Sequence, residues 1–467
     1  MRANMKAYDM VIKNGIIVTA TDVYKADIGI KNEKIIEIAK EIDSNSAGNV
    51  IDATDKYVFP GAIDVHTHLD MPFGGTVSSD NFETGTVAAA YGGTTTIIDF
   101  ALQSKGESLK KALEIWHNKA QGKAFIDYGF HIAITDMNDE ILDEMKELIK
   151  EGYPSFKLFM TYEGLRVNDD VLLKALLLAK EEGGLICVHA ENFYIIDYLV
   201  KKFIREGKTH PKFHALSRPT IAEWEAVSRA VKIAQFANAP LYIVHLSCME
   251  ALKEVTYARN RGLPIMAETC PQYLLLSEER YEEEGFNGAK YVMSPPLRSS
   301  EHLQALWEGL KCGQLQVVST DHCPFFLKGQ KDLGKDSFDK IPNGAPGIEL
   351  RLALLFSYGV MTKRITLQQF VEIISTNPAK IFGLYPQKGT IAIGSDADLV
   401  IFDPSIERRV TKELLHENVD YTPYEGFRIT GLPVATIVRG EVVIKDGKLV
   451  GQKGYGKFLK RKNLMVV

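Results

Sequence analysis

Eight short apolar runs, separated by longer amphipathic stretches, constrain the fold of this chain more than any other feature. The runs have the length of buried strands, and they cover residues 57–65, 94–100, 125–133, 155–159, 184–189, 241–245, 264–268 and 315–321. Helical spacing marks four of the stretches, at 139–151, 169–182, 220–238 and 249–261. Eight such repeats predict an α/β fold of the (β/α)8 TIM-like barrel type. A doubly wound open sheet is the alternative, but no G-x-G-x-x-G motif follows an early strand.

The two ends of the chain have a different pattern, in which short strands alternate with tight turns. Within residues 1–56, Asn14-Gly15 separates two apolar runs and indicates a β-hairpin. Short strands return in residues 385–450, where Asp446-Gly447 indicates another turn. We expect these two segments to pack together as one small β-sandwich beside a barrel of residues 57–384. The tail, 451–467, is rich in Lys and Arg, and we expect it to be solvated or to contact another subunit.

Composition and charge narrow the classes of function. A net charge of −5 and a pI near 6.2 give no reason to expect binding to nucleic acid or to an anionic membrane. Apolar runs stay below the ~20 residues that span a bilayer, and the first residues lack the apolar core of a signal peptide. The five cysteines are scattered and form no C-x-x-C motif, which favours reduced thiols. We therefore expect a cytoplasmic protein.

The first apolar run ends at two histidines, His66 and His68. Residues two apart in a strand point to the same side, so both imidazoles suit one transition-metal ion. Taken alone, two hydrogen-bonded histidines would explain this short pattern equally well. The ends of other predicted strands also carry polar side chains, namely Lys157, His189, His245 and Asp321. Because strand ends converge on one face of a barrel, we predict a shared metal site with enough ligands for two ions. A protonated Lys157 could not be a ligand there, so it would have to be neutral or chemically converted.

Several motifs at these strand ends resemble the dihydropyrimidinase/D-hydantoinase family of cyclic amidohydrolases. They span the whole predicted barrel, and they are GAIDVHTH (61–68), FKLFM (156–160), VHAEN (188–192), VHLS (244–247), MSPPLR (293–298) and STDHCPF (319–325). The resemblance implies metal-dependent hydrolysis of the cyclic amide bond of dihydropyrimidines or 5-substituted hydantoins, which yields N-carbamoyl amino acids. It also implies a homotetramer or a dimer.

The resemblance further assigns roles to individual residues. It implies that Lys157 is an N6-carboxylysine, formed with carbon dioxide, and that this anion bridges two ions, most commonly Zn²⁺. His66 and His68 would bind one ion with Asp321, and His189 and His245 would bind the other. A hydroxide activated by the two ions would attack the ring carbonyl.

The remaining assignments concern the substrate. By the same resemblance, Tyr162 would donate to the oxyanion, and Asp321 would move the proton from water to the leaving nitrogen. Ser294 and Asn343 would hold the amide edge of the substrate. Without the resemblance, Tyr162 would be read as an ordinary packing residue, and Asn343-Gly344 only as a turn.

Three other classes of related protein are alternatives to the dihydropyrimidinase/D-hydantoinase resemblance. Dihydroorotases usually have an arginine two residues after the H-x-H motif, where this chain has Asp70, and allantoinases generally lack this spacing and the Ser-Pro-Pro run. Collapsin-response-mediator-like scaffolds lose the metal ligands, which are all present here. Apolar side chains in the loop 69–76, together with Phe159, suggest a pocket for an uncharged or apolar ring substituent. We expect structural roles for His131, His322 and Cys323, and no special role for Glu349 and Arg351.

Overall fold

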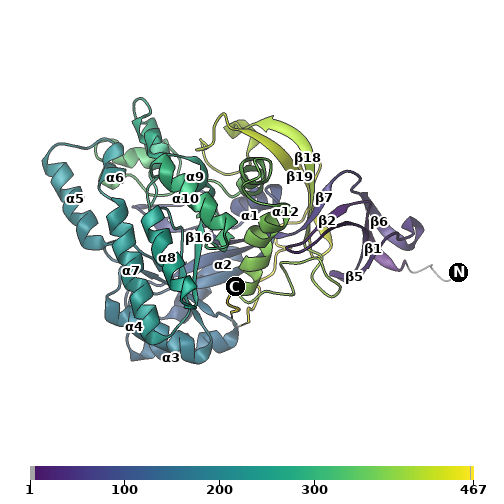
Figure 1. Cartoon of the computed structure of the whole chain (residues 1–467), viewed down its shortest axis with the longest axis horizontal. Coiled ribbons are helices and arrows are strands. Elements are labelled where there is room, and N and C mark those ends of the chain that lie inside the picture. Colours follow the sequence, from purple (N-terminus) through teal and green to yellow (C-terminus); the bar gives the residue numbers. More distant parts are fainter. Residues whose placement is uncertain (1–5, 463) are drawn as a thin grey trace.

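The computed structural model describes residues 6–462 and 464–467, and its largest element is a barrel of eight parallel strands (Figure 1). Most of residues 1–9, considered above for a signal peptide, lie outside the described residues. The barrel strands follow chain order around the sheet: β8 (Ala62–Thr67), β11 (Thr94–Leu102), β12 (Asp127–Ala133), β13 (Ser155–Phe159), β14 (Leu185–His189), β15 (Leu241–Ile243), β16 (Ile265–Thr269) and β17 (Val317–Val318). This confirms the predicted (β/α)8 fold.

The first and last strands are joined mainly beyond their regular parts. Thr67 forms a parallel bridge with His322, and the Thr320 hydroxyl donates to the Asp64 carboxylate at 2.6 Å. The fully buried Arg351 donates to the carbonyls of Ile63, on β8, and Val318, on β17, at 2.9 and 3.1 Å. Arg351 therefore has a structural role that the sequence did not predict, because it connects the two strands that close the barrel.

Helices surround the barrel, and in Figure 1 the helices α3, α4, α7 and α8 lie along its outer face. The longer helices are α1 (Thr84–Tyr91), α2 (Leu109–Ala120), α3 (Asp139–Glu151), α4 (Asp169–Glu182), α5 (Phe193–Arg205), α7 (Thr220–Ala237), α8 (Met249–Asn260) and α10 (Ser300–Lys311). Short helical turns complete the set: α6 (Lys212–Leu216), α9 (Pro271–Leu275), α11 (Arg351–Leu355), α12 (Leu367–Val371) and α13 (Asn377–Ile381). Among the described residues, no helix combines the length and apolar character needed to cross a membrane.

Local sequence explains the bounds of α3, which match the prediction. The Asn138 side chain accepts the backbone N–H of Ile141 and caps the first turn, and Gly152 ends the helix with a φ of 101°. Ile141, Met145, Leu148 and Ile149 form its buried face. A helix with one apolar stripe therefore packs against the barrel, as the spacing of these residues predicts.

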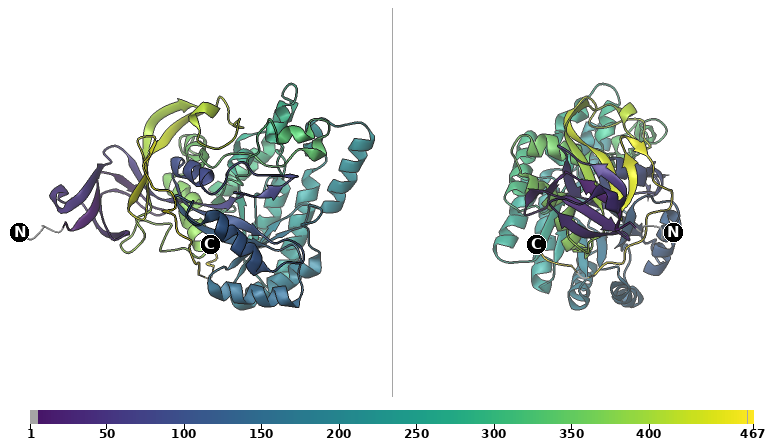
Figure 2. Two further views of the ribbon diagram at one scale, coloured as in Figure 1. Left: turned by 180° about the vertical axis from the view of Figure 1, so that it is seen from behind. Right: turned by 90° about the vertical axis from the view of Figure 1, so that its right-hand side faces the viewer.

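The β-sandwich takes strands from both ends of the chain, as Figure 2 shows beside the barrel. One sheet has the order β5-β4-β1-β6, with bounds Lys34–Ala39, Asp27–Lys31, Tyr8–Lys13 and Ala47–Asp52. The other has the order β21-β20-β19-β18-β7-β2-β3, with bounds Lys448–Leu449, Glu441–Lys445, Arg428–Val438, Leu399–Arg409, Tyr57–Pro60, Ile16–Val18 and Val23–Lys25. Buried aliphatic residues from both sheets, such as Ile28 and Leu399, form one core between them.

The apolar run 57–65 is not the single strand that its composition predicts. Residues Tyr57–Pro60 form β7, which pairs with β18 and β2 in the sandwich, and the barrel strand β8 begins at Ala62. Gly61 lies between them, where a Cβ atom would come within 2.1 Å of Thr95 Oγ1. A residue without a side chain is needed here, because the chain crosses from one sheet to the other against β11.

The basic tail was expected to be solvated or to contact another subunit, whereas much of it packs against the barrel of its own chain. Tyr128, near the start of β12, donates its N–H to Lys457 O at 3.0 Å and accepts from Leu459 N at 2.8 Å. The buried Arg461 donates to Ser155 Oγ at 2.8 Å and to Phe130 O. This packing was not predicted, because a basic composition does not reveal that one arginine is buried against the barrel; contact of the tail with another subunit stays a prediction.

Candidate active site

One cavity at the carboxyl ends of the barrel strands is lined by every site residue that the sequence singled out. These are His66, His68, Lys157, Tyr162, His189, His245, Ser294, Asp321 and Asn343. Most come from the ends of β8, β13 and β14, or from the loops that directly follow the strands. The structure therefore brings together residues that are up to 277 positions apart in sequence, from His66 to Asn343.

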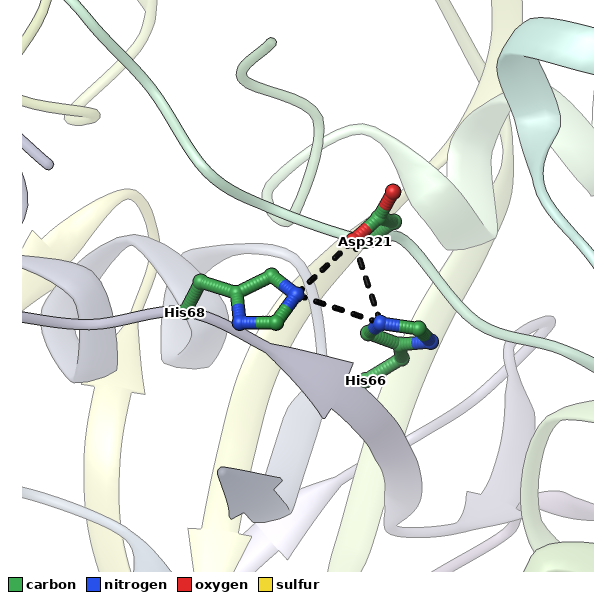
Figure 3. Close-up of side chains that lie close together, drawn as sticks. All are labelled: His66, His68 and Asp321. Carbon is green, nitrogen blue, oxygen red and sulfur yellow. Dashed lines mark hydrogen bonds and ion pairs between the residues drawn. The ribbon is translucent and has the colours of Figure 1, made fainter. Parts of the chain in front are cut away.

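The closest group in the cavity is formed by His66, His68 and Asp321 (Figure 3). Asp321 Oδ1 lies 3.1 Å from the Nε2 atom of each histidine, and the two Nε2 atoms are 3.2 Å apart. Ligand atoms that bind one ion at ~2.1 Å with angles near tetrahedral or octahedral values are about 3.0–3.4 Å apart. The three atoms therefore have the spacing of ligands to a single metal ion.

Glu268, at the end of β16, fixes the orientation of His66. Its carboxylate accepts from His66 Nδ1, from the Tyr242 hydroxyl at 2.9 Å and from the His245 backbone N–H at 3.1 Å. A carboxylate on Nδ1 leaves Nε2 of His66 free to bind a metal, as is usual for metal-binding histidines. The sequence interpretation did not include Glu268, although its place at the end of an apolar run was a usable signal.

A second histidine pair faces the first. The ring centroid of His245 lies 4.4 Å from that of His189 and 5.3 Å from that of His66. His189 Nε2 donates to Glu191 at 2.7 Å, and Arg218 donates to the same carboxylate oxygen at 2.7 Å. Although burial opposes it, Arg218 lowers the pKa of Glu191 to about 2, so this carboxylate is ionised. Glu191 and Arg218 are two further site residues that the strand-end pattern did not reveal.

Lys157 lines the same cavity as the two groups of histidines and is almost completely buried. Its Nζ atom lies 4.8 Å from the centre of the Phe100 ring and 5.4 Å from that of Phe159. Burial lowers the pKa of the ammonium to about 8, so a neutral fraction exists near neutral pH. A neutral amine can react with an electrophile, which an ammonium cannot.

The donor set fits divalent metal ions. His66 and His189 each have one ring nitrogen held by a buried carboxylate, which is the arrangement of a metal-binding histidine with its supporting partner. Burial lowers the pKa of His68 to about 4, so its imidazole is neutral and retains a lone pair. His245 has a buried Nδ1 atom with no hydrogen-bond partner among the described residues. Imidazole and carboxylate ligands together are suited to zinc and similar ions.

Three residues of the cavity have backbone conformations that residues other than glycine rarely adopt. The φ angles of Tyr162, His245 and Asp321 are 73°, 39° and 53°. Positive φ angles at residues other than glycine are uncommon, and they occur preferentially at functional sites. Each of the three residues lies two or three positions beyond the end of a strand, where the chain turns, and each side chain lines the cavity.

Tyr162 is half-buried among aromatic and charged neighbours. Its ring centroid lies 5.3 Å from that of Phe73 and 5.2 Å from that of His189, and Arg218 lies 5.3 Å from the ring. Burial raises the pKa of Tyr162 to about 12, so the phenol stays protonated and can donate a hydrogen bond. Tyr162 lines the same cavity as the candidate metal-binding residues, which agrees with the predicted role more than with an ordinary packing role.

The remaining lining is mostly apolar. It consists of Met71, Phe73, Leu102, Phe159, Leu165, Cys323 and Gly344. Asp70, in contrast, is not among the lining residues, and its carboxylate accepts the backbone N–H of Phe82 at 3.1 Å. Asp70, which stands where dihydroorotases have an arginine, therefore uses its carboxylate within its own loop. His131 and His322 are buried and bound to Ser155 and Asp80, as expected for structural residues.

The likeness to known proteins covers almost the entire chain. The profile of the amidohydrolase family matches residues 57–443, and that of the urease alpha-subunit N-terminal domain matches residues 1–58. A D-hydantoinase of Geobacillus stearothermophilus is 55% identical over 97% of this chain and 96% of its own. The crystal structure of a dihydropyrimidinase from Brevibacillus agri NCHU1002 has a TM-score of 0.97 at 51% identity, over 98% of this chain and 99% of that chain. An L-hydantoinase (dihydropyrimidinase) from Arthrobacter aurescens is less similar, with a TM-score of 0.89 and 31% identity over 97% of this chain and 100% of that chain. The chain therefore belongs to the dihydropyrimidinase/D-hydantoinase family of amidohydrolase enzymes.

Proposed function

We propose that this enzyme hydrolyses the cyclic amide bond of 5-substituted hydantoins or dihydropyrimidines and releases N-carbamoyl amino acids. One observation carries the proposal: a single cavity holds four histidines, a buried lysine, an aspartate and a protonated tyrosine in an arrangement suited to two metal ions. The relatives named D-hydantoinase and dihydropyrimidinase support the same reaction.

The ligands divide into two groups. His66, His68 and Asp321 would hold one ion, and His189 and His245 would hold the other, with Lys157 between them. Zinc is the ion best suited to these ligands, although other divalent ions fit. When bound, two such ions lower the pKa of a shared water toward 7 and so supply a nucleophile near neutral pH.

We further propose that Lys157 is carboxylated. A neutral amine attacks the carbon of CO2, so that an N–C bond forms, one proton is released and a carbamate anion remains. Burial of Lys157 and its lowered pKa, to about 8, support this reaction because they make the neutral amine accessible. The resulting anion would satisfy the positive charge of the two ions and would bridge them.

The other residues act on the substrate. Asp321 is placed to accept the proton of the attacking water and to return it to the ring nitrogen that leaves, which opens the ring. Tyr162 is placed to donate a hydrogen bond to the oxygen that becomes negatively charged. Ser294 and Asn343, which are joined by a hydrogen bond of 3.0 Å from Asn343 Nδ2 to Ser294 Oγ, would orient the amide edge of the ring.

The apolar part of the cavity would receive the ring substituent. Phe73, Phe159 and Leu165 are three of its members, and none carries a charge. We therefore propose a preference for aliphatic or aromatic substituents over anionic ones, since a carboxylate would lose its hydration there without a partner.

Turnover and metal content test the proposed reaction together. Protein purified without chelator should contain close to two divalent ions per subunit and should open dihydrouracil or a 5-substituted hydantoin. Allantoin is the control substrate, because preferential turnover of allantoin would favour the allantoinase alternative. Metal-free protein that remains inactive after zinc addition would instead favour a non-catalytic scaffold.

We also propose that the enzyme is a cytoplasmic homotetramer, or a dimer. A shallow surface between α4 and α7 supports assembly, because apolar side chains line it and remain partly exposed. Phe236 is 78% exposed and Trp224 is 40% exposed, and patches of this kind usually mark interfaces. Light scattering of the purified protein tests the proposal, and Phe236→Lys should shift the mass toward the monomer. A wild-type monomer would contradict it.

A further inference from the structure

Lys331, at the start of the short helix η4 (Lys331–Gly334), is a fully buried lysine in the loop that follows the metal-ligand segment of Asp321. Its ammonium donates to two backbone carbonyls, Val292 O at 2.9 Å and Pro342 O at 3.1 Å. Burial lowers the pKa of Lys331 to about 7, because its neighbours supply carbonyl oxygens in place of a carboxylate. Such a group is costly to bury, so its position calls for an explanation.

Both carbonyls belong to the segments that would hold the substrate. Val292 lies two residues before Ser294, and Pro342 directly precedes Asn343. Val292 O also accepts the N–H of Gly344 at 3.0 Å, so the ammonium and one backbone bond together hold the two segments side by side. The Asn343 segment also packs closely against the segment that follows Asp321, since a Cβ atom on Gly344 would come within 2.2 Å of Cys323 O.

Other buried donors hold the carbonyls on either side of Ser294. His214 Nε2 donates to Met293 O at 2.8 Å, and the Tyr273 hydroxyl donates to Pro295 O at 2.7 Å. Among the described residues, no hydrogen-bond donor reaches the carbonyl of Ser294 itself. The backbone on both sides of Ser294 is therefore fixed, and Lys331 connects this fixed segment to that of Asn343.

The residue before Lys331 makes a similar connection to a third part of the cavity. Gln330 Nε2 donates to Val77 O at 2.7 Å and to Thr76 Oγ1 at 2.8 Å. These residues form β10 (Thr76–Val77), which pairs with β9 (Pro72–Phe73) and so carries the cavity residue Phe73. The segment around Lys331 thus contacts each of the three loops that face the substrate.

We infer that Lys331 is a positioning residue, whose ammonium sets the spacing between the Ser294 and Asn343 segments and thereby the fit of the ring's amide edge. The inference rests on the proposed function, because it concerns how the substrate ring is held. Lys331 does not touch the metal ligands, so its loss should weaken substrate binding more than metal binding or the chemical step.

Lys331→Met tests this role, because methionine keeps most of the side-chain volume and removes every donor. We expect KM to rise about tenfold, as for the loss of one well-oriented hydrogen bond to the substrate, while kcat stays within about threefold and metal content is unchanged. Lys388→Met is the matched control: Lys388 is equally buried, but it pairs with Asp127 at 2.8 Å and Asp398 at 2.5 Å near the barrel floor. This control should lose stability without a change in KM.

Two further variants keep the inference testable if the methionine variant does not fold. Lys331→Arg retains a charged donor and should keep KM within about threefold of the wild type, whereas Lys331→Gln, which is shorter and neutral, should raise KM. Equal KM values in all folded Lys331 variants would overturn the inference, as would parallel losses of metal and activity in Lys331→Met. Wild-type protein that opens neither ring would overturn the proposed function and this inference with it.

Discussion

Replacing Glu191 with glutamine should weaken both the fold and the second metal position. The pKa of Glu191 is about 2, against 4.5 for an ordinary glutamate, because Arg218 holds it ionised despite burial. That difference corresponds to about 3 kcal/mol at pH 7. A neutral amide keeps a hydrogen-bond acceptor and loses the charge, so we expect Glu191→Gln to lower the free energy of unfolding by between about 1 and 3 kcal/mol.

The pH dependence follows from the sign of this shift. A carboxyl group with a depressed pKa in the folded protein stabilises it fully above the unfolded value of 4.5, and the stabilisation disappears as the pH falls to about 2. The difference between wild type and Glu191→Gln should therefore be largest near pH 7 and should shrink steadily below pH 4.5. Urea unfolding at several pH values measures it.

Metal binding provides the second readout. Glu191 accepts from His189 Nε2 and so fixes which ring nitrogen faces the cavity; loss of such a partner typically costs 10–100-fold in metal affinity. Zinc retention against a competing chelator measures this loss. Glu182→Gln is the control, because Glu182 pairs with Lys146 at the surface, at 2.9 Å, and should change neither quantity by much. A Glu191→Gln variant with wild-type stability and zinc affinity would refute the reasoning.

Three further substitutions test other parts of the molecule. Lys157→Ala should abolish turnover and reduce the bound zinc, whereas the control Lys174→Ala, at an exposed lysine, should do neither. Elemental analysis and a ring-opening assay measure both quantities, and a Lys157→Ala variant with full zinc and full rate would refute the bridge. Tyr162→Phe should lower kcat by about 10²–10³ with metal content unchanged, and an unchanged kcat would return Tyr162 to a packing role. Arg461→Met should lower the free energy of unfolding by about 1–3 kcal/mol, because Ser155 Oγ and a carbonyl lose a buried donor. Urea unfolding measures this change, and an unchanged free energy of unfolding would mean that Arg461 does not stabilise this part of the barrel.

The barrel was predictable because strand and helix patterns are local. Residues 139–151 and 169–182 form helices with the predicted bounds, since their apolar positions lie within each segment and a glycine directly follows each one. The switch at Gly61 was not predictable, because the run 57–65 is equally apolar in the sandwich and in the barrel. The burial of Arg461 was also hidden, since it depends on contacts with strands more than 300 positions away.

The gathering of the candidate site residues was predictable for a geometric reason, although their roles stay predictions. Parallel strands in a barrel end on the same face, so His66, His189 and Asp321 could be grouped from their strand positions alone. Residues that act through these ligands were missed, because they need not lie at regular positions. Glu191 lies two residues after His189 and could have been noticed, whereas Arg218 lies in the short connection between α6 and α7 and Lys331 begins η4, where no periodic pattern marks either residue.

The pairing of β7 with β18 has a consequence for the order in which the protein is made. The opening strands of the chain cannot complete their sheet until the residues of β18 and β19 have left the ribosome, nearly at the end of synthesis. Until then the early strand β7, whose other neighbour is β2, offers an unpaired edge, which is liable to join with strands of other nascent chains. We therefore expect the sandwich strands to be the part of the chain that most needs chaperones during translation, while the barrel can begin to assemble as its repeats emerge.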